Sequence, residues 1–297
     1  MNMGESVIAR LKNKAKTTGK PFQLHLQLFC QEEFLRRLAA SRFAENLVLK
    51  GGLFIYALTN FESRATVDID FLLRQFPGTI EDIQRMVNEI IATDSGNDFI
   101  TFTSRGFETI SPQRKYTGVS FQLIGQIKNT RTPFDVDFGV GDIIVPTPHK
   151  RSIPVQLEGF DVPEVLTYSL ESTVAEKFDA LLQRLELTSR MKDIYDIYYL
   201  SKMFDFDGVA LHAAIFETLQ NRGTAYERDS FDRIIALADN KDIQMRWRQY
   251  LRRLRMDDLL LADVMHCIEQ FLRPVWSALI SESEFSLRWD CHVVKWR

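Results

Sequence analysis

The most constraining feature of the sequence is an apolar strand that ends on two adjacent glycines. Residues 47–73 read LVLKGGLFIYALTNFESRATVDIDFLL. The short apolar run predicts a buried strand that ends at Lys50, and the glycines mark the start of a helix. The end of the segment predicts a second strand over 66–73. The segment therefore predicts a strand, a helix and a strand, with two aspartates inside the last element.

The two aspartates of this strand share a face. Asp68 and Asp70 are separated by one residue, so their backbone positions are about 6–7 Å apart and both carboxylates project the same way. Two such carboxylates can share a hard cation such as Mg²⁺. A solvated strand face explains the same pattern without any ligand. An isolated Asp-x-Asp therefore does not decide between the two interpretations.

A third candidate carboxylate lies further along the chain. The run FDVDFGVGD alternates in the same way, and we choose Asp137 from it. If its strand neighbours the first, Asp68, Asp70 and Asp137 converge and could hold two Mg²⁺ ions about 3.5–4 Å apart. That arrangement serves in-line displacement at phosphorus.

The glycines suit a phosphate. Gly51 and Gly52 lie where a strand becomes a helix, so a ligand can approach the backbone, and the helix N–H groups favour an anion. A tight turn is the simpler explanation of a glycine pair. We name Lys50, Gly51 and Gly52 as candidate nucleotide-binding residues.

The remaining sequence divides into two parts of different pattern. Helical spacing over 4–18, 22–41 and 79–92 alternates with strand-like runs up to about residue 145, and the chain beyond 168 is almost entirely helical in pattern. A proline-rich passage over 145–168 is the expected connection. We expect an α+β fold with a mixed sheet in a first domain, residues 1–150, followed by a helical domain, residues 151–297.

Composition excludes some classes of protein. With 45% hydrophobic and 26% charged residues the chain is expected to fold, and a net charge of −3 requires any nucleic acid to meet a local basic face. No apolar run approaches the ~20 residues that cross a bilayer, and the N-terminus lacks a signal-peptide pattern. The three cysteines have no metal-ligand spacing, which favours buried free thiols and a cytoplasmic location.

These motifs together resemble a known family. The glycine pair, the Asp-x-Asp strand and a third strand acid are typical of the DNA polymerase β-like nucleotidyltransferases. More narrowly, the chain resembles the AbiEii/AbiGii nucleotidyltransferase toxins over roughly residues 45 to 200. The segments that carry the resemblance are VLKGGLFIYAL, RATVDIDFLL, DFGVGDIIVPTP, ESTVAEKFDALLQR and SRMKDIYDIYYL, in that order.

The resemblance adds residues from two predicted helices. Lys177 and Asp193 match the family's lysine and aspartate motifs, which implies phosphate binding for the lysine and a catalytic role for both. Thr66 matches a hydroxyl position in the family, although β-propensity alone explains a threonine there. Asp193 could instead stabilise the start of its helix by about 0.3–1 kcal/mol. Asp196 lies one turn further on the same face.

The densest basic segment is QMRWRQYLRRLR, residues 244–255. Its arginines could follow an RNA backbone while an aromatic residue stacks on a base, so we name Arg246, Arg248 and Arg252 as candidate RNA-binding residues. A solvated helix face explains the segment equally well.

We therefore expect an Mg²⁺-dependent nucleotidyltransferase. The resemblance implies a toxin of a toxin–antitoxin or phage-defence system with a cognate antitoxin, CTP or GTP as the nucleoside triphosphate (NTP), and RNA, above all tRNA, as the acceptor. Two alternatives stay open: transfer to a small molecule or a protein, and a module that binds NTP or a partner without catalysis.

Overall fold

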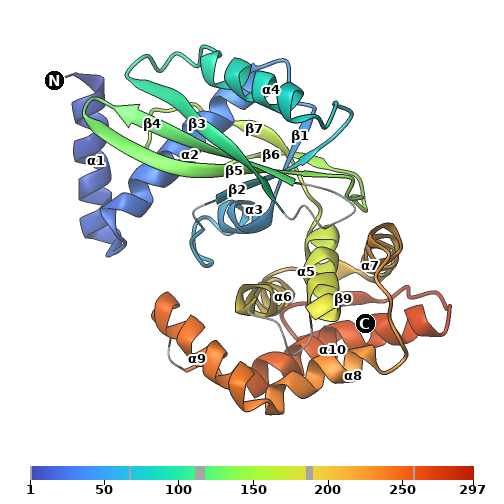
Figure 1. Ribbon diagram of the computed structural model, residues 1–297. Helices are drawn as coiled ribbons and strands as arrows, with labels where there is room; N and C mark the ends of the chain where they lie inside the picture. The colour runs from blue at the N-terminus through green and yellow to red at the C-terminus, as the bar shows by residue number, and fades with distance from the viewer. Residues whose placement is uncertain (1, 67, 111–117, 185–189, 257) are drawn as a thin grey trace. The chain divides into compact units, whose positions relative to one another are not determined.

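A seven-stranded mixed sheet forms the centre of the first part of the protein. The computed structural model describes residues 2–66, 68–110, 118–184, 190–256 and 258–297. The strand order is β3-β4-β5-β2-β1-β7-β6 (Figure 1). The strands are β1 (Leu47–Lys50), β2 (Asp68–Leu73), β3 (Ile100–Ile110), β4 (Gly118–Ile127), β5 (Thr130–Val140), β6 (His149–Ser152) and β7 (Glu164–Thr167).

The sheet is mixed because some neighbouring strands run antiparallel and others run parallel. β3, β4 and β5 pair antiparallel in chain order, as expected for strands joined by short turns. β5 runs parallel to β2, and β7 runs parallel to β1, while β1 and β2 are antiparallel. The helix that starts on the glycines therefore connects two antiparallel neighbours, and the α+β expectation with a mixed sheet is confirmed for this part of the chain.

Four helices accompany this sheet: α1 (Met3–Thr18), α2 (Phe22–Ala40), α3 (Gly51–Leu58) and α4 (Ile80–Ala92). The oxygen of the Thr79 side chain accepts a hydrogen bond from the Asp82 N–H and so caps α4, as its sequence predicts. α2 packs on α4, β5 and β7, whereas α3 packs on β1 and β2. Figure 1 shows α3 and α4 on opposite sides of the sheet.

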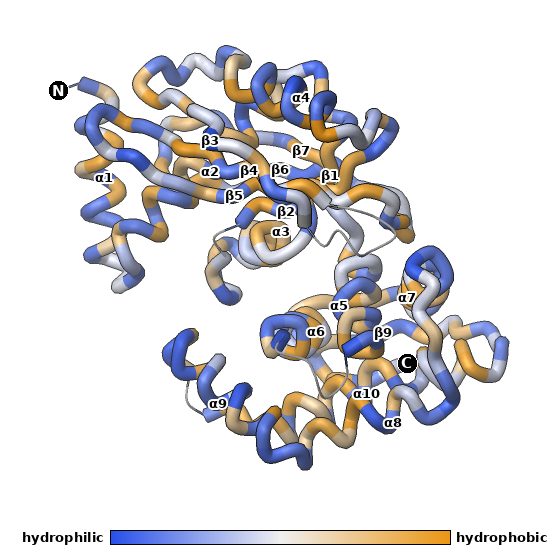
Figure 2. The backbone as a smooth tube through the Cα atoms, in the orientation of Figure 1, coloured by the Kyte–Doolittle hydropathy of each residue, from blue (hydrophilic) through white to orange (hydrophobic). Residues whose placement is uncertain are grey.

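The second part of the chain is mostly helical. Its helices are α5 (Leu170–Arg184), α6 (Met191–Met203), α7 (Gly208–Arg222), α8 (Ser230–Ile235), a 3₁₀ turn (Ala236–Asp239), α9 (Lys241–Leu254) and α10 (Leu261–Ile280). Hydrophobic residues recur along α10, which is extensively buried (Figure 2). A small sheet of β8 (Phe206–Asp207), β9 (Arg288–Asp290) and β10 (Lys295–Trp296) was not expected, because strands of two or three residues show no measurable alternation.

The compact units of the chain differ from the expected division at residue 150. The chain forms one compact unit from Met1–Gly141 and Pro148–Tyr168, and a second from Asp142–Thr147 and Ser169–Arg297. The passage expected to be a connection instead supplies β6 and β7, and β7 pairs with β1 through Val48 and Leu49. Non-local pairing with β1 determines that strand, so its local proline-rich pattern does not reveal it.

The structure also bears on smaller expectations about a strand, a helix, the cysteines and membrane-spanning segments. The strand expected over 66–73 begins at Asp68, with Thr66 outside it and residue 67 outside the described residues. Residues 185–189, which continue the expected helix of α5, also lie outside them. The cysteines are free and buried, as predicted. None of the described helices is both long enough and apolar enough to cross a membrane.

Candidate active site

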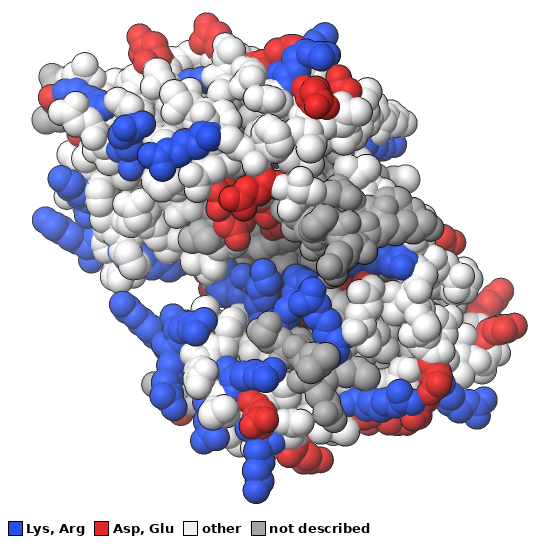
Figure 3. Space-filling model, in the orientation of Figure 1, with Lys and Arg blue, Asp and Glu red and all other residues white. Residues whose placement is uncertain are grey.

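Parallel pairing of β2 with β5 brings the acidic residues of the two strands into register. Asp68 is the partner of Asp135, and Asp70 is the partner of Asp137. Adjacent strands lie about 4.8 Å apart, so these carboxylates emerge on one face as neighbours. All four residues are half-buried. Figure 3 shows acidic side chains gathered over this part of the sheet. The strand neighbourhood expected for Asp137 is therefore present.

Gly51 lets the start of α3 approach this acidic face. A Cβ atom placed on Gly51 would lie 2.0 Å from Oδ2 of Asp70, a distance that no side chain tolerates. The residue also has a φ of +68°, in the left-handed region that glycine adopts without strain. Both the backbone conformation and the close approach thus require glycine. The glycine turn sits directly on the Asp70 carboxylate.

Gly52 has a second close neighbour. A Cβ atom there would lie 2.8 Å from Oγ1 of Thr66. Thr66 is therefore held against the first turn of α3, where no side chain of Lys50 caps the helix. β-propensity does not explain Thr66, since the residue precedes the strand. Its contact with Gly52 gives this threonine a place beside the candidate phosphate site.

Lys50 lies at the same edge. It is the partner of Asp70 across β1 and β2, and its ammonium lies 5.2 Å from the ring centroid of Tyr168. A Cβ atom on Gly139 would be 3.5 Å from Lys50 Nζ, so the lysine side chain crosses towards β5. A cation between β2 and β5 partly offsets the charge of the aspartates. The aromatic contact with Tyr168 was not foreseen, because it joins residues 118 positions apart.

Asp137 is a carboxylate whose hydrogen-bonding capacity the protein itself does not fully satisfy. Burial, together with the nearby charges of Asp70, Asp68 and Asp135, raises its pKa to about 6, although a hydrogen bond from Ser120 lowers the pKa in part. Oδ1 of Asp137 is buried without a hydrogen-bond partner. Ser120 is the partner of Asp137 on β4 and was missed by the sequence analysis. A cation at Asp137 would offset the repulsion between the aspartates and would give the buried Oδ1 atom a partner.

The residues present fit a divalent cation by their chemistry. Carboxylate oxygens are the ligands that Mg²⁺ takes, and Asp137 offers one that has no other use in the fold. Across the described residues, no three side chains of Asp, Glu, His or Cys form a group already close enough to hold a metal ion. The fold therefore places the candidate ligand carboxylates on neighbouring strands, but it does not bring three of them together as a preformed metal site.

A buried ionic cluster occupies the second unit. The ammonium of Lys177, on α5, lies 2.6 Å from Oδ2 of Asp196 and 3.2 Å from Oδ1 of Asp193, both on α6. Arg190 Nε lies 2.6 Å from Oδ2 of Asp193. The side chain of Lys177 is 10% exposed, and those of Asp193 and Asp196 are 2% and 1% exposed. The structure thus brings together Lys177 and Asp193, and adds Asp196 as the nearer partner of the lysine.

A second cationic centre lies on α7. Arg222 Nη2 is 2.9 Å from Asp142 Oδ1 and 3.0 Å from Glu176 Oε1, and its Nη1 is 2.9 Å from Asp179 Oδ2. Burial lowers the pKa of this guanidinium, but the three carboxylates raise it above its usual value. No local pattern around Arg222 could have predicted this cluster, because its acids come from α5 and from the segment at Asp142, both distant in sequence.

The candidate RNA-binding arginines lie on α9, within the second unit. The arginines at 248 and 252 are exposed, and that at 246 is half-buried. Trp247 and Leu251 face the interior, as the solvated-face interpretation of this helix expects. Burial alone therefore does not distinguish an RNA-binding face from an ordinary basic surface.

A family comparison decides the class of this protein. The model of the nucleotidyl transferase AbiEii toxin family, of type IV toxin–antitoxin systems, matches residues 33–277. The chain belongs to the AbiEii family. It is therefore a nucleotidyltransferase toxin, as the resemblance of its motifs implied.

Solved structures share the fold of this AbiEii chain. The nucleotidyltransferase toxin MenT4 of Mycobacterium tuberculosis H37Rv superposes with a TM-score of 0.52 and 18% identity, covering 93% of this chain and 99% of that protein. JHP933 from Helicobacter pylori is more distant, with a TM-score of 0.45 and 15% identity over 87% of this chain and 93% of that one. MenT4 supports the nucleotidyltransferase fold, and the more distant structure adds no argument.

A curated protein also shows partial similarity to this AbiEii chain. The UvrABC system protein B of Streptococcus pyogenes serotype M5 (strain Manfredo) is 26% identical over 186 residues, which is 60% of this chain. The match spans only 26% of that protein's length. It therefore does not bear on the activity of the AbiEii chain.

Proposed function

We propose that this AbiEii enzyme transfers a nucleotide from an NTP to RNA, with tRNA as the acceptor and Mg²⁺ as the cofactor. The observation that carries the proposal is the register of β2 with β5, which places Asp70 beside Asp137 directly under the glycine turn of α3. The family supplies nucleotidyl transfer, and the carboxylates supply a place for the cation that such chemistry uses.

In this proposal, different residues of the first unit bind the cation and the phosphates. Asp68, Asp70 and Asp137 would hold Mg²⁺, and the backbone at Gly51 and Gly52 would receive the phosphates. When bound, Mg²⁺ neutralises phosphate charge and makes the acceptor hydroxyl more acidic. The hydroxyl oxygen forms a bond to the α-phosphorus, the bond to the pyrophosphate oxygen breaks, and the hydroxyl proton passes to water. Lys50 and Thr66 line the turn and would orient the triphosphate.

The second unit contributes further candidates. We retain Lys177 as a nucleotide-binding residue and Asp193 as a catalytic residue, because both lie in the segments that carry the resemblance and within the range 33–277 that the family model matches. Their ion pairs support a shared role, since Asp193 and Asp196 fix the position of the lysine ammonium. CTP and GTP are the NTPs that the family resemblance favours. A cognate antitoxin, as type IV systems have, and action in the cytoplasm during phage defence complete the proposal.

A labelling assay tests the acceptor and the cofactor together. The protein is incubated with total RNA and each of the four α-³²P-labelled NTPs, with Mg²⁺ and with EDTA. We expect label in RNA of tRNA size, with one NTP, and only with Mg²⁺. Label in protein or in small molecules alone would replace RNA as the acceptor, and transfer that persists in EDTA would remove the cation from the proposal.

The Asp70→Asn variant tests the site itself. It removes one negative charge without changing the size of the side chain, and we expect transfer to fall by at least about 100-fold, a loss typical of removing one electrostatic group from an active site. Asp98→Asn, an exposed change in the same unit, should leave transfer unchanged. Equal activity of the two variants would place the active site elsewhere.

A further inference from the structure

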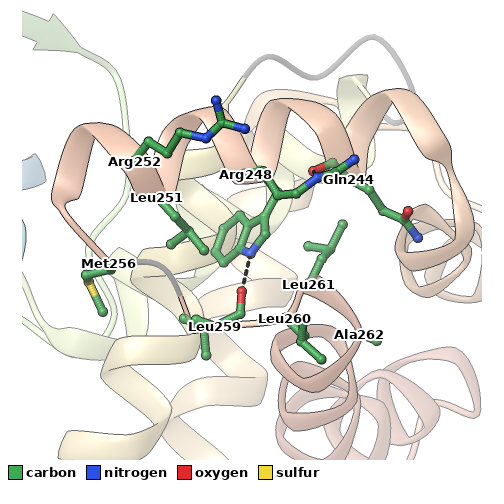
Figure 4. Close-up of a pocket in the computed structure, with 10 residues that line it drawn as sticks. Gln244, Arg248, Leu251, Arg252, Met256, Leu259, Leu260, Leu261 and Ala262 are labelled. Carbon is green, nitrogen blue, oxygen red and sulfur yellow. Dashed lines mark hydrogen bonds between the residues drawn. The ribbon is translucent and has the colours of Figure 1, made fainter.

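A pocket between α9 and the start of α10 is not used by the proposed transfer site. Its volume is about 430 Å³, within the usual range for ligand pockets. Its lining comes from residues 244–262, so it is a local feature of the second unit. Figure 4 shows the α9 side chains and the segment before α10 arranged around it.

The inner wall of the pocket is apolar and fixed. The indole N–H of Trp247 donates to the carbonyl oxygen of Leu259 at 2.8 Å, which ties α9 to the segment before α10. Trp247 and Leu251 are almost fully buried, whereas Leu260 at the rim is 65% exposed. An apolar wall whose residues are fixed in this way suits a flat or apolar group.

The rim of the pocket is cationic. Arg248 and Arg252 lie one helical turn apart on α9, and both line the pocket. Within the described part of the chain, neither forms an ion pair with a carboxylate, and the lining includes no acidic residue. Arg248 Nε donates a hydrogen bond to the carbonyl oxygen of Gln244 at 3.4 Å, which leaves the charge of the guanidinium unpaired. Arg222, in contrast, contacts three carboxylates. The guanidinium groups at this rim therefore keep their charge for an anion, and Figure 3 shows basic side chains gathered over α9.

We infer that this pocket takes an unpaired nucleoside of the RNA acceptor. The base would lie against Leu251 and Leu261, and the flanking phosphates would pair with Arg248 and Arg252. Arginine pairs with phosphate in a bidentate way. The leucines would offer the base an apolar surface, in place of the aromatic platforms on which many single-strand-binding proteins stack bases. The inference rests on the proposed RNA acceptor. The basic sequence of α9 is compatible both with RNA binding and with an ordinary solvated surface, and the inference places RNA binding at this pocket.

An acidic peptide is the competing occupant. Its carboxylates could form ion pairs with Arg248 and Arg252, and one of its apolar side chains could enter the pocket. We favour RNA because a nucleotide combines a flat base and a phosphate within one residue, and the lining of this one pocket combines apolar residues with two arginines. The experiment includes both probes.

Binding is measured by fluorescence anisotropy without NTP, so that it does not depend on catalysis. The probes are a 5′-fluorescein 12-nucleotide single-stranded RNA, the duplex of the same sequence, and a labelled 12-residue poly-glutamate. The double variant Arg248→Ala/Arg252→Ala should weaken single-strand binding about 10-fold. The slope of log affinity against log salt should fall by about 1.4, at about 0.7 for each phosphate contact. Arg253→Ala, an exposed arginine of α9 outside the lining, is the matched control and should change affinity less than threefold.

A pocket-filling variant separates the base from the phosphates. Ala262→Trp places a large side chain at the rim without changing charge. It should weaken single-strand binding several-fold and leave duplex binding unchanged. Circular dichroism and urea unfolding confirm that each variant is folded.

Three results would overturn the inference. They are no measurable RNA binding by the original chain, an effect of Arg253→Ala equal to that of the double variant, and variants that lose poly-glutamate binding while keeping RNA binding. The labelling assay reports the proposed function separately, since absence of label in RNA rejects the acceptor even where binding follows the expected pattern.

Discussion

At the scale of single residues, this protein depends on glycines and aspartates whose roles are set by a few close approaches. Position 51 requires glycine for two reasons: its φ is positive, and a Cβ atom would collide with the Asp70 carboxylate. Asp137 carries a buried oxygen without a partner. Sequence alone identified both residues as candidates, Gly51 from the change of strand to helix and Asp137 from the alternation of acids along a strand. It could not show that the glycine touches an aspartate, because that contact depends on pairing between strands.

Two glycines of equal φ separate the conformational cost of a side chain from the steric one. Gly19 and Gly51 both have a φ of +68°, but a Cβ atom on Gly19 meets nothing within 4 Å. Gly19→Ala should lower the free energy of unfolding by about 1–2 kcal/mol, the cost of a left-handed residue. Gly51→Ala should cost more than this and should abolish transfer, because Asp70 must move. Urea unfolding and the labelling assay measure the two effects. Equal stability loss, with transfer intact, would contradict the contact with Asp70.

At the scale of elements, two helices hold buried ionisable side chains whose partners come from other segments. α5 presents Lys177 to the two aspartates of α6. α2 buries Glu32, which accepts a hydrogen bond from the Gln156 N–H at 2.9 Å. Helical spacing predicted these helices well. It did not predict the partners of their charges, which come from sequence positions up to 124 residues away.

Removal of the α5 lysine tests the first of these clusters. Lys177→Met leaves two buried carboxylates without their shared cation, so the free energy of unfolding should fall by about 3–5 kcal/mol. Lys192→Met, at an exposed position of α6, should change it by less than about 0.5 kcal/mol. Chemical denaturation of both variants provides the measurement. Similar stabilities would show that the lysine is not needed to offset the aspartates.

The buried acid of α2 predicts a pH dependence. Burial raises the pKa of Glu32 from its ordinary value of 4.5 to about 8. Between these values the folded chain holds a proton that the unfolded chain releases. This group therefore stabilises the fold fully below pH 4.5, and its contribution is lost as pH rises towards 8, by at most about 1.4 kcal/mol per pH unit.

The Glu32→Gln variant removes that proton equilibrium. Its stability relative to the original chain should rise between pH 5 and pH 8, as followed by urea unfolding at several pH values. Glu108→Gln, an exposed change on β3, is the control and should give a difference that does not vary with pH. A pH-independent difference for Glu32→Gln as well would mean that the carboxyl is ionised in the folded chain.

At the scale of the whole molecule, the chain is divided by sheet pairing and not by its proline-rich passage. β7 adds to the free edge of β1, and Val165, Thr167 and Tyr168 are buried with it. A fragment of residues 1–168 should therefore unfold cooperatively in urea. A fragment of residues 1–150 should not, because it exposes the edge of β1 and the core beneath β7. Cooperative unfolding of both fragments at the same urea concentration would restore the boundary expected at residue 150.

The sequence by itself determined the local features of this protein: helices with an apolar face, strands with alternating aspartates, a glycine turn, and family motifs that identify a nucleotidyltransferase toxin. These features are set by neighbours within a few residues along the chain. Only the tertiary structure decided which acids share a register, which carboxylates surround Lys177 and Arg222, and where β7 belongs. Those contacts join distant segments, and their energies depend on burial and pairing that no local pattern encodes.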